Sequence, residues 1–518
     1  MTRTASPLHL DLPLHALIFA GQMLWLALTG FGAAGTLPPF VLPAFFLLAA
    51  LTLIRIHEHA PQLGSRLVMV PALIATALYL LMLLLDMGGL LWGFAMPRQF
   101  PVWARVVWYQ SGLLLMHPWV YQAVRTWGAR SAHALRRRGY LHGKVWVVML
   151  VAGAGLWLVR SQNISSDGYD WLKYSLWPDQ WALYLREPLG TLVFHLVSWA
   201  GIQWLGFSPS GSIALLSIAC GLAAFWLAAQ VIARLFDERD WGLIFALMLA
   251  SGGVTQVFAG NIEIYALLIV GYTAFLYAAL RYLGDEWPAW PAGVVFGLLF
   301  CTHLSSGWWL PAFMLLPIVK ALMGRVAANP LRPMSELYLS ALFVAGTFFV
   351  FLLNHGYGGD LAAMNQHFWG DRVMRVGTDN AMFHPLSAYF TADYYLTLLN
   401  EYFYLAAWLF LLLPTLMLAL RAWVQPDALT LWLALMAGMY GLYSLVWRAD
   451  RPMPSDWDIF SGVTLPLVLT LGRYWTRLAL PQPVIAYVLY QCCVFSGGYV
   501  VLLLLRNHFK VTEWPLFL

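Results

Sequence analysis

The sequence contains little charge for its length. Of its 518 residues only 10% are charged, whereas 61% are hydrophobic, and the mean hydropathy is +0.70. A soluble domain typically carries about 25% charged residues. The composition therefore excludes a large soluble domain. The formal net charge of +5 is also too small to indicate a nucleic-acid-binding protein.

Cysteine is scarce as well. The four cysteines all lie inside apolar segments. Because no pair of them falls in a loop, we expect neither a disulfide framework nor a zinc site built on thiolates. The first apolar run also lacks the small-residue cleavage site of a signal peptide, so we expect it to remain as a membrane span.

Long apolar runs dominate what is present. About fifteen of them approach the length needed to cross roughly 30 Å of hydrocarbon, which predicts an all-α, polytopic membrane helix bundle. Basic residues cluster most densely between Arg125 and Lys144, and this loop should therefore be cytoplasmic, as should the N-terminus. The run Leu189–Leu205 is ambiguous. The distribution of basic residues fits better if this run does not cross.

This topology places several polar loops together on the outer face. The first long loop carries Asp167 and Asp170, followed by aromatic residues at helical spacing on both sides of Pro178. We interpret that stretch as two short helices lying in the interface, apolar face down. The two aspartates then serve as a general base or as metal ligands at the mouth of a membrane cavity. The alternative is that they cap an interfacial helix.

Three more residues on the predicted outer face are candidates for a functional site. Glu263 opens an apolar run at membrane depth, where an acid needs a partner, a wet cavity or a proton. The alternative is that it stabilises a helix N-terminus. His303 occupies a tight outer turn, although a lone His at a helix end is more often an ordinary hydrogen-bonded residue. Glu187 precedes Pro188 at the start of the ambiguous run.

The loop from Arg448 to Asp458 concentrates charge in an otherwise uncharged region. Arg448 and Arg451 offer the planar fork that matches phosphate oxygens. Asp456 and Asp458 are suited either to hold a divalent cation with a diphosphate or to orient the arginines. A further loop, Asn354–Glu401, is too long for a bare connector and predicts a lid or binding loop, in which the sequence assigns no residue a role.

In this order the features resemble those of the GT-C glycosyltransferases, the membrane superfamily that includes protein O-mannosyltransferases and aminoarabinose transferases. In that family a span leads into an outer loop with an essential acid, then interfacial helices and further spans. Here the fifth span leads to Asp167 and Asp170. Arg186–Leu189 looks like the segment that introduces an interfacial helix, and Gly260–Tyr265 and Asp456–Asp458 look like outer-face motifs of bacterial members.

The resemblance covers residues 145–518 and implies a GT-C-like catalytic core there. Four additional spans in residues 1–144 depart from the family pattern and suggest an accessory N-terminal module. The family's soluble C-terminal domain has no counterpart, so acceptor recognition should fall to membrane loops.

If the resemblance holds, the protein transfers a sugar from a polyprenyl phosphate or diphosphate to a lipid, glycan or protein acceptor, with inversion at the anomeric carbon. It should work at the outer face of a bacterial plasma membrane. Asp167 would deprotonate the acceptor, and the arginines would neutralise the departing phosphate. The implied catalytic residues are Asp167, Asp170 and Glu263, and the implied substrate-binding residues are Lys173, Glu187, His303, Arg448, Arg451, Asp456 and Asp458.

Two other classes of membrane protein remain as alternatives. A transporter or lipid flippase would place polar groups near the midplane and often shows repeated halves, whereas these ionisable residues crowd one face and no internal repeat is evident. A polymerase or ligase of lipid-linked glycans would share the donor and differ in its acceptor.

Overall fold

The computed structural model describes residues 14, 17–18, 20–22, 41–84, 92–95, 97, 100–126, 145–161, 168–176, 187–237, 240–325, 331–368, 383–420, 425–448 and 457–508. Within these residues all regular secondary structure is helical, apart from one isolated β-bridge between Phe383 and Trp447. The predicted all-α fold is confirmed.

The N-terminal part forms α2 (Val41–Leu63), η1 (Arg66–Val68), α3 (Met69–Leu84), α4 (Trp92–Ala95) and α5 (Val102–Leu115). The middle of the chain forms α8 (Val145–Leu158), α9 (Gly168–Leu176), α10 (Pro188–Ala200), the π-helical turn η4 (Gly201–Leu205), α11 (Pro209–Leu235), α12 (Trp241–Leu249), α13 (Gly252–Phe258), α14 (Tyr265–Leu283), α15 (Trp290–Thr302) and η5 (Leu304–Trp309). The remainder forms α16 (Leu310–Met314), α17 (Leu316–Leu322), α18 (Leu331–Tyr357), α19 (Leu361–Phe368), η7 (Leu386–Phe390), α20 (Ala392–Ala406), α21 (Leu409–Leu418), α22 (Ala428–Val446), η9 (Trp457–Val463), α23 (Thr464–Thr476) and α24 (Gln482–His508).

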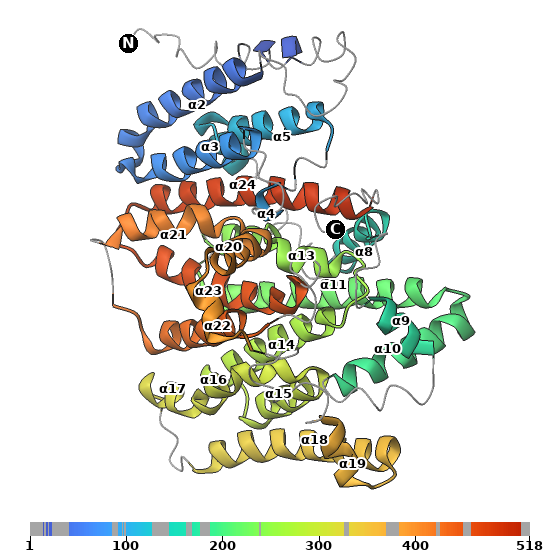
Figure 1. The fold of residues 1–518 in the computed structure, drawn as a ribbon. Coiled ribbons are helices and arrows are strands. Elements are labelled where there is room, and N and C mark those ends of the chain that lie inside the picture. The colour runs from blue at the N-terminus through green and yellow to red at the C-terminus, as the bar shows by residue number, and fades with distance from the viewer. Residues whose placement is uncertain are drawn as a thin grey trace.

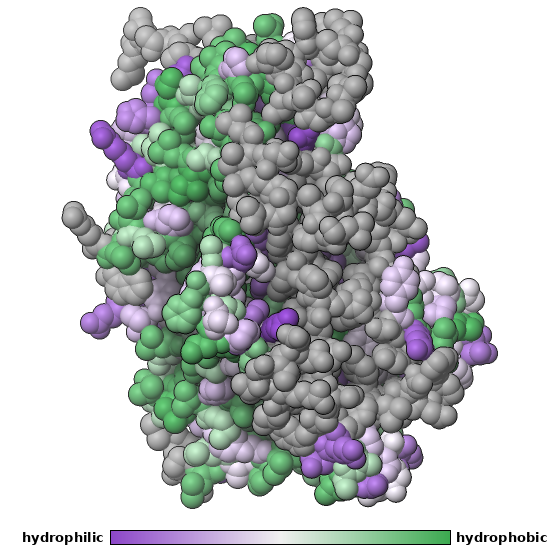
Figure 2. Space-filling view, viewed as in Figure 1, coloured by the Kyte–Doolittle hydropathy of each residue, from purple (hydrophilic) through white to green (hydrophobic). Residues whose placement is uncertain are grey.

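Seven of the described helices are long and apolar enough to cross a membrane, and the number rises to nine if each of two bent helix pairs is one span. The sequence-based figure of about fifteen also included shorter runs. One of these runs is divided into η5, α16 and α17, because a proline near the start of each of the last two pieces begins a new helix. The first expected span, Leu14–Phe31, lies mostly outside the described residues. The chain is a multi-pass membrane protein with broad hydrophobic areas on its visible surface (Figure 2).

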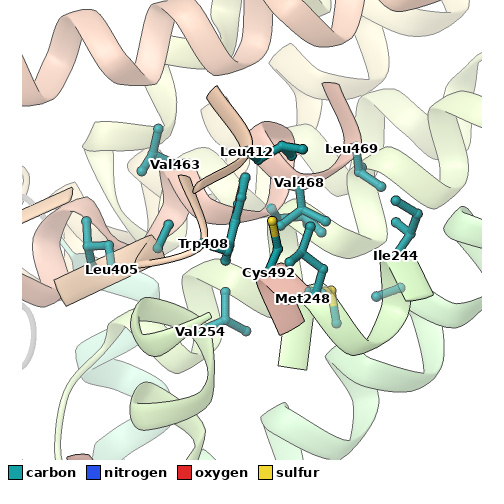
Figure 3. Close-up of a cluster of buried hydrophobic side chains, with 14 of the residues drawn as sticks. Ile244, Met248, Val254, Leu405, Trp408, Leu412, Val463, Val468, Leu469 and Cys492 are labelled. Atoms are coloured by element: carbon teal, nitrogen blue, oxygen red, sulfur yellow. The ribbon is translucent and has the colours of Figure 1, made fainter. Parts of the chain in front are cut away.

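The two bent pairs are joined to each other at their bends. α12 and α13 meet at 66°, and α20 and α21 meet at 100°. Trp408, fully buried at the second bend, donates its indole N–H to the hydroxyl of Ser251 at the first bend, over 2.8 Å. Around this bond pack Val254, Leu412 and Cys492, which come from three different helices (Figure 3). The core of the molecule therefore contains the breaks in these two spans.

The N-terminal helices cover one side of α24 (Figure 1). Tyr487 of α24 donates its hydroxyl hydrogen to the carbonyl of Met116, over 2.6 Å. The backbone N–H of Gly93 in α4 donates to the side-chain oxygen of Asn400 in α20, over 2.9 Å. These contacts attach the segment to the rest of the bundle, and its role as a separate accessory module stays a prediction.

The bundle has two polar ends. We call the end that holds Glu187, Asn261, Glu263, His303 and Asp458 the site end. Figure 1 shows α9, α10, α19 and the end of α24 towards it, at the right. The opposite end is fastened by ion pairs between loops, which are Lys320–Asp285 at 2.7 Å, Arg281–Glu286 at 2.8 Å, Arg473–Asp427 at 2.7 Å and Arg477–Asp427 at 2.8 Å.

The ambiguous run Leu189–Leu205 begins and finishes at the site end. α10 starts beside the His303 turn, and η4 follows it directly. Gly201 packs so closely on Ser212, in the first turn of α11, that an added Cβ would lie 2.0 Å from the Ser212 hydroxyl. Ala214, half a turn further along α11, lies against Gly260 at the site end. Both ends of the segment therefore lie at the site end of the bundle, and its not crossing the membrane stays a prediction.

Candidate functional site

A buried carboxylate–imidazole pair fixes the start of α10. The Oε1 atom of Glu187 lies 2.8 Å from Nε2 of His303, and the side chains are only 9% and 8% exposed. Nδ1 of His303 accepts the backbone N–H of Ser305 over 2.9 Å. An accepting Nδ1 carries no proton, so the ring hydrogen belongs to Nε2, which donates it to Glu187. The second Glu187 oxygen is buried and has no hydrogen-bond partner among the described residues, which makes it suited to contact a polar group of a ligand.

Glu263 connects the bundle to α9. Its side chain is 3% exposed, and Oε2 accepts the indole N–H of Trp171 over 3.0 Å. Trp171 itself is buried and packs edge-on against Phe194 of α10. We expected this tryptophan to lie in the interface with the apolar face of its helix. Instead it points into the bundle, because the indole carries the one donor of the ring and satisfies an otherwise costly buried acid.

After Glu187–His303 and Trp171–Glu263, a third buried link joins Asn261 to Asp458 at the start of η9. The side-chain amide of Asn261 donates to Oδ2 of Asp458 over 3.3 Å, and both side chains are buried. Asp458 also accepts the hydroxyl of Ser461 at its backbone carbonyl, over 2.6 Å. The predicted functional residues Glu263 and Asp458 thus lie close in space through one short loop, although almost two hundred positions separate them in sequence.

The loop of residues 260–264 provides one partner in two of these links, Glu263 and Asn261. Gly260 has a φ of +75°, a conformation that glycine adopts without strain. An added Cβ would also lie 2.9 Å from the Cβ of Arg160, at the end of α8. The N–H of Ser161 donates to the carbonyl of Ala259 over 2.8 Å. The loop is therefore fixed against α8 on one side and, through close packing of Ile264 on Gly190, against α10 on the other.

Beside these links lies a polar network that the sequence did not reveal. The guanidinium of Arg506, near the end of α24, donates to the hydroxyl of Tyr404 over 3.3 Å. That hydroxyl donates to Oε1 of Gln256 over 3.0 Å, and the same oxygen accepts the amide of Asn507 over 3.0 Å. The one feature of the sequence that could have indicated this network is Arg506, a single arginine at the end of a long apolar run. The network ties α13, α20 and α24 together at the site end.

Arg448 follows α22 at the site end. It is half-buried, and its side chain forms no hydrogen bond or ion pair with any residue that the structure describes. Tyr443, five positions earlier, packs against Phe460 of η9 at a ring distance of 5.3 Å. This contact brings the end of α22 next to the segment that carries Asp458. An arginine with no counter-ion among the described residues is suited to bind an anionic group of a substrate.

The other predicted site residues are placed only in part. Asp167, Arg451 and Asp456 lie outside the described residues. Asp170 lies in the first turn of α9, and its side chain is not described. Lys173 is exposed on the same helix. A helix, α9, is present where the first of the two interfacial helices was expected, and its position in the interface stays a prediction. The stretch expected to form the second falls at residues 177–186, outside the described part.

No three His, Cys, Asp or Glu side chains within the described residues converge as a metal site would require. Asp456, which the sequence paired with Asp458 as a cation-binding site, is not among those residues. The participation of a divalent cation at Asp456 and Asp458 therefore stays a prediction.

No protein-family model and no curated protein sequence matches this chain. Two solved structures are similar to it in fold. ArnT from Cupriavidus metallidurans in the apo state gives a TM-score of 0.49 at 13% identity, over 72% of this chain and 78% of that one. ArnT from the same organism bound to undecaprenyl phosphate gives 0.48 at 13% identity, over 71% and 78%. A similarity this distant transfers no residue role, and the function proposed below depends on this chain's own residues.

Proposed function

We propose that this protein is an integral membrane glycosyltransferase. It moves a sugar from a polyprenyl phosphate or diphosphate to a lipid, glycan or protein acceptor, as the GT-C resemblance of its sequence implies. The observation that carries the proposal is the gathering of buried polar links at the site end. Three buried links, Glu187–His303, Trp171–Glu263 and Asn261–Asp458, meet at one end of an apolar bundle.

Buried polar groups at this depth favour a catalytic centre over a mere anchor. A carboxylate removed from water is costly unless it is paired, and ionisable groups at membrane depth are functional sites by default. A glycosyl transfer from a lipid-linked phosphate needs a base for the acceptor proton and cations for the phosphate. Acids and Arg448 at one end of the bundle supply both kinds of group.

We assign the roles as follows. Asp167, at the head of α9, removes the acceptor proton as the acceptor attacks the anomeric carbon with inversion, and Asp170 supports it. Glu263 holds α9 in place through Trp171, so its part is to position the two aspartates. Arg448 and Arg451 bind the donor phosphate, with Lys173 nearby on α9. Glu187 and His303 contact the sugar or the acceptor through the unpaired Glu187 oxygen.

We further propose that the site end faces outward from a bacterial plasma membrane and that the N-terminus is cytoplasmic. The loops at the opposite end carry basic residues such as Arg234, Arg281, Lys320 and Arg473. Short basic loops are retained on the cytoplasmic side. The outer side is also where polyprenyl-linked sugars meet envelope acceptors.

The test is an assay of donor cleavage that does not require the sugar to be known. Purified protein is reconstituted with membrane lipids extracted from the cells that express it, and the release of free polyprenyl phosphate is followed by mass spectrometry. Loss of a positioned base costs roughly 10²–10⁴-fold, so Asp167→Asn should release polyprenyl phosphate at least about a hundredfold more slowly than wild type.

Asp360→Asn is the matched control, because this exposed aspartate caps α19 at the same end and Asn retains the cap. It should keep the wild-type rate. Release at the wild-type rate by Asp167→Asn, in protein that purifies and melts normally, would remove Asp167 from catalysis. No release above protein-free vesicles by the wild type would overturn the transferase proposal.

A further inference from the structure

A short segment closes over the end of α22 beside Arg448. Phe383 forms a bridge with Trp447. The backbone N–H of His384 donates to the carbonyl of Val446 over 3.0 Å, and the hydroxyl of Tyr394 donates to the carbonyl of Leu445. The last carbonyls of a helix otherwise lack partners. These bonds satisfy them and fix the backbone of His384 against the helix end that Arg448 follows.

The ring of His384 is held but not hydrogen-bonded. It packs edge-on against Tyr394 at a centroid distance of 5.1 Å and against Tyr389 at 6.4 Å. Neither ring nitrogen forms a hydrogen bond with any described residue. The side chain of Arg448 likewise has no acceptor within that part of the chain. His384 and Arg448, two half-buried side chains that are both able to donate to an anion, therefore lie near each other, and no described residue provides that anion.

The charges around His384 keep it neutral while no anion is present. Burial, and then the positive charge of Arg448, hold the pKa of His384 below its ordinary value. Among the described residues, the titratable groups that face its ring are the phenols of Tyr389 and Tyr394, and the charged group is the Arg448 guanidinium. No described carboxylate acts on it. An anion beside Arg448 would reverse this balance, because it cancels the repulsion and attracts a proton to the ring.

We propose that His384 and Arg448 form a phosphate subsite in which His384 takes up a proton when the phosphate of a polyprenyl donor binds. The inference rests on the proposed function and identifies the side chain that protonates the departing phosphate. A phosphodiester carries one negative charge, and that charge pairs with Arg448. The proton bound by His384 then provides a second cation on the same phosphate.

The proton on His384 has a use in the transfer. The acceptor oxygen loses its proton to the base and bonds to the anomeric carbon. The bond from that carbon to the phosphate oxygen breaks, and its electron pair stays on the phosphate, which gains one negative charge. The imidazolium of His384 donates its proton to that oxygen. The phosphate therefore leaves as a monoanion, and the ring returns to its neutral form.

The experiment measures how binding depends on pH. The probe is farnesyl methyl phosphate, a diester whose own charge does not change between about pH 6 and about pH 9. Wild-type protein in detergent should lose affinity as pH rises through the pKa of His384 in the complex, because the complex holds one proton more than the free protein. His384→Gln should bind roughly tenfold more weakly at the acidic limit, since a charge-assisted hydrogen bond is lost, and its affinity should not change with pH.

Two comparisons complete the design. His355→Gln removes an exposed histidine at the site end and should retain the wild-type pH dependence. The backbone bond of His384 survives in the glutamine variant, so its melting temperature should match that of wild type. Inorganic phosphate and phosphatidylglycerol are titrated in parallel to separate a free ion and a bulk lipid headgroup from a prenyl phosphate. We expect both to bind more weakly than the probe.

The outcomes separate the two proposals. Binding of the diester by wild type without pH dependence, or the same pH dependence in His384→Gln, would overturn the role of His384 and leave the transferase proposal standing. Tighter binding of phosphatidylglycerol than of the probe would make this a lipid-headgroup site instead of a donor subsite. If the wild type does not bind the diester at any pH, the phosphate subsite is overturned, and the transferase proposal is decided by the assay of polyprenyl phosphate release.

Discussion

The bond between Trp171 and Glu263 is one of the contacts that join α9 to the rest of the bundle. The indole N–H is a single donor, and the carboxylate it meets is 3% exposed. Removing one partner of a buried hydrogen bond leaves the other to bear its desolvation cost, roughly 1–3 kcal/mol. The bond therefore stabilises the fold and at the same time sets the position of the helix whose first turn holds Asp170.

Trp171→Phe tests this directly. The phenyl ring retains most of the packing against Phe194 and removes the donor. We expect a free energy of unfolding lower by about 1–3 kcal/mol. We also expect polyprenyl phosphate release at least about tenfold slower, because small misplacements of a catalytic group are costly. Trp204→Phe, an exposed tryptophan in η4, is the control and should change neither. A Trp171→Phe protein with wild-type stability and rate would mean that α9 is held elsewhere.

For single residues, the sequence predicted which side chains lie at the site end better than it predicted which of them contact each other. Topology alone placed Glu187, Glu263, His303 and Asp458 at one end, and the structure brings all four there. It did not predict that Glu187 meets His303, because helical periodicity gives the face of a residue and not the element opposite. His384 sits in a loop without periodicity, so no pattern indicated that its backbone would cap α22.

Prolines and glycines explain where the elements differ from the apolar runs. Length and hydropathy identify a run that is able to cross, but they do not detect a break inside it. The bend between α12 and α13 occurs at Ser251, just before two adjacent glycines, and hydropathy is continuous across it. Within the described residues, fewer helices than predicted spans are long and apolar enough to cross a membrane, because the prediction also counted short and divided runs. The helical class is confirmed, whereas the non-crossing of Leu189–Leu205 stays a prediction.

The path of α10 yields a labelling prediction. Ser208, between η4 and α11, is exposed at the site end, as is Asp360, before α19. Ser335 is exposed in the first turns of α18, at the opposite end. Cysteines at positions 208 and 360 should react with an impermeant thiol reagent applied outside intact cells. A cysteine at position 335 should react only after the membrane is opened.

The native cysteines serve as the background, because three are buried and Cys493 is half-buried. Labelling of position 208 together with position 335, and not with position 360, would mean that Leu189–Leu205 crosses the membrane. The links at loop 260–264 would then not share one face.

For the whole molecule, the arrangement is an apolar bundle with a polar structure at each end, and the two ends differ in kind. The opposite end is fastened by ion pairs that are partly exposed to solvent, such as Arg477–Asp427, and exposed pairs contribute little stability. The site end uses buried pairs, which are strongly coupled to the fold and costly to break. This asymmetry is what we expect when one end performs chemistry and the other connects loops.

The central claim is that the site end recognises a phosphate on a polyprenyl chain. Native mass spectrometry tests it most directly. The purified protein is titrated with a polyprenyl phosphate and, separately, with the polyprenol of the same chain length. The two ligands share the lipid and differ in the phosphate. A one-to-one adduct with the phosphate should form at a concentration at least about tenfold lower than with the alcohol, and Arg448→Ala should remove most of that preference. Equal adducts with phosphate and alcohol in the wild-type protein would contradict the account.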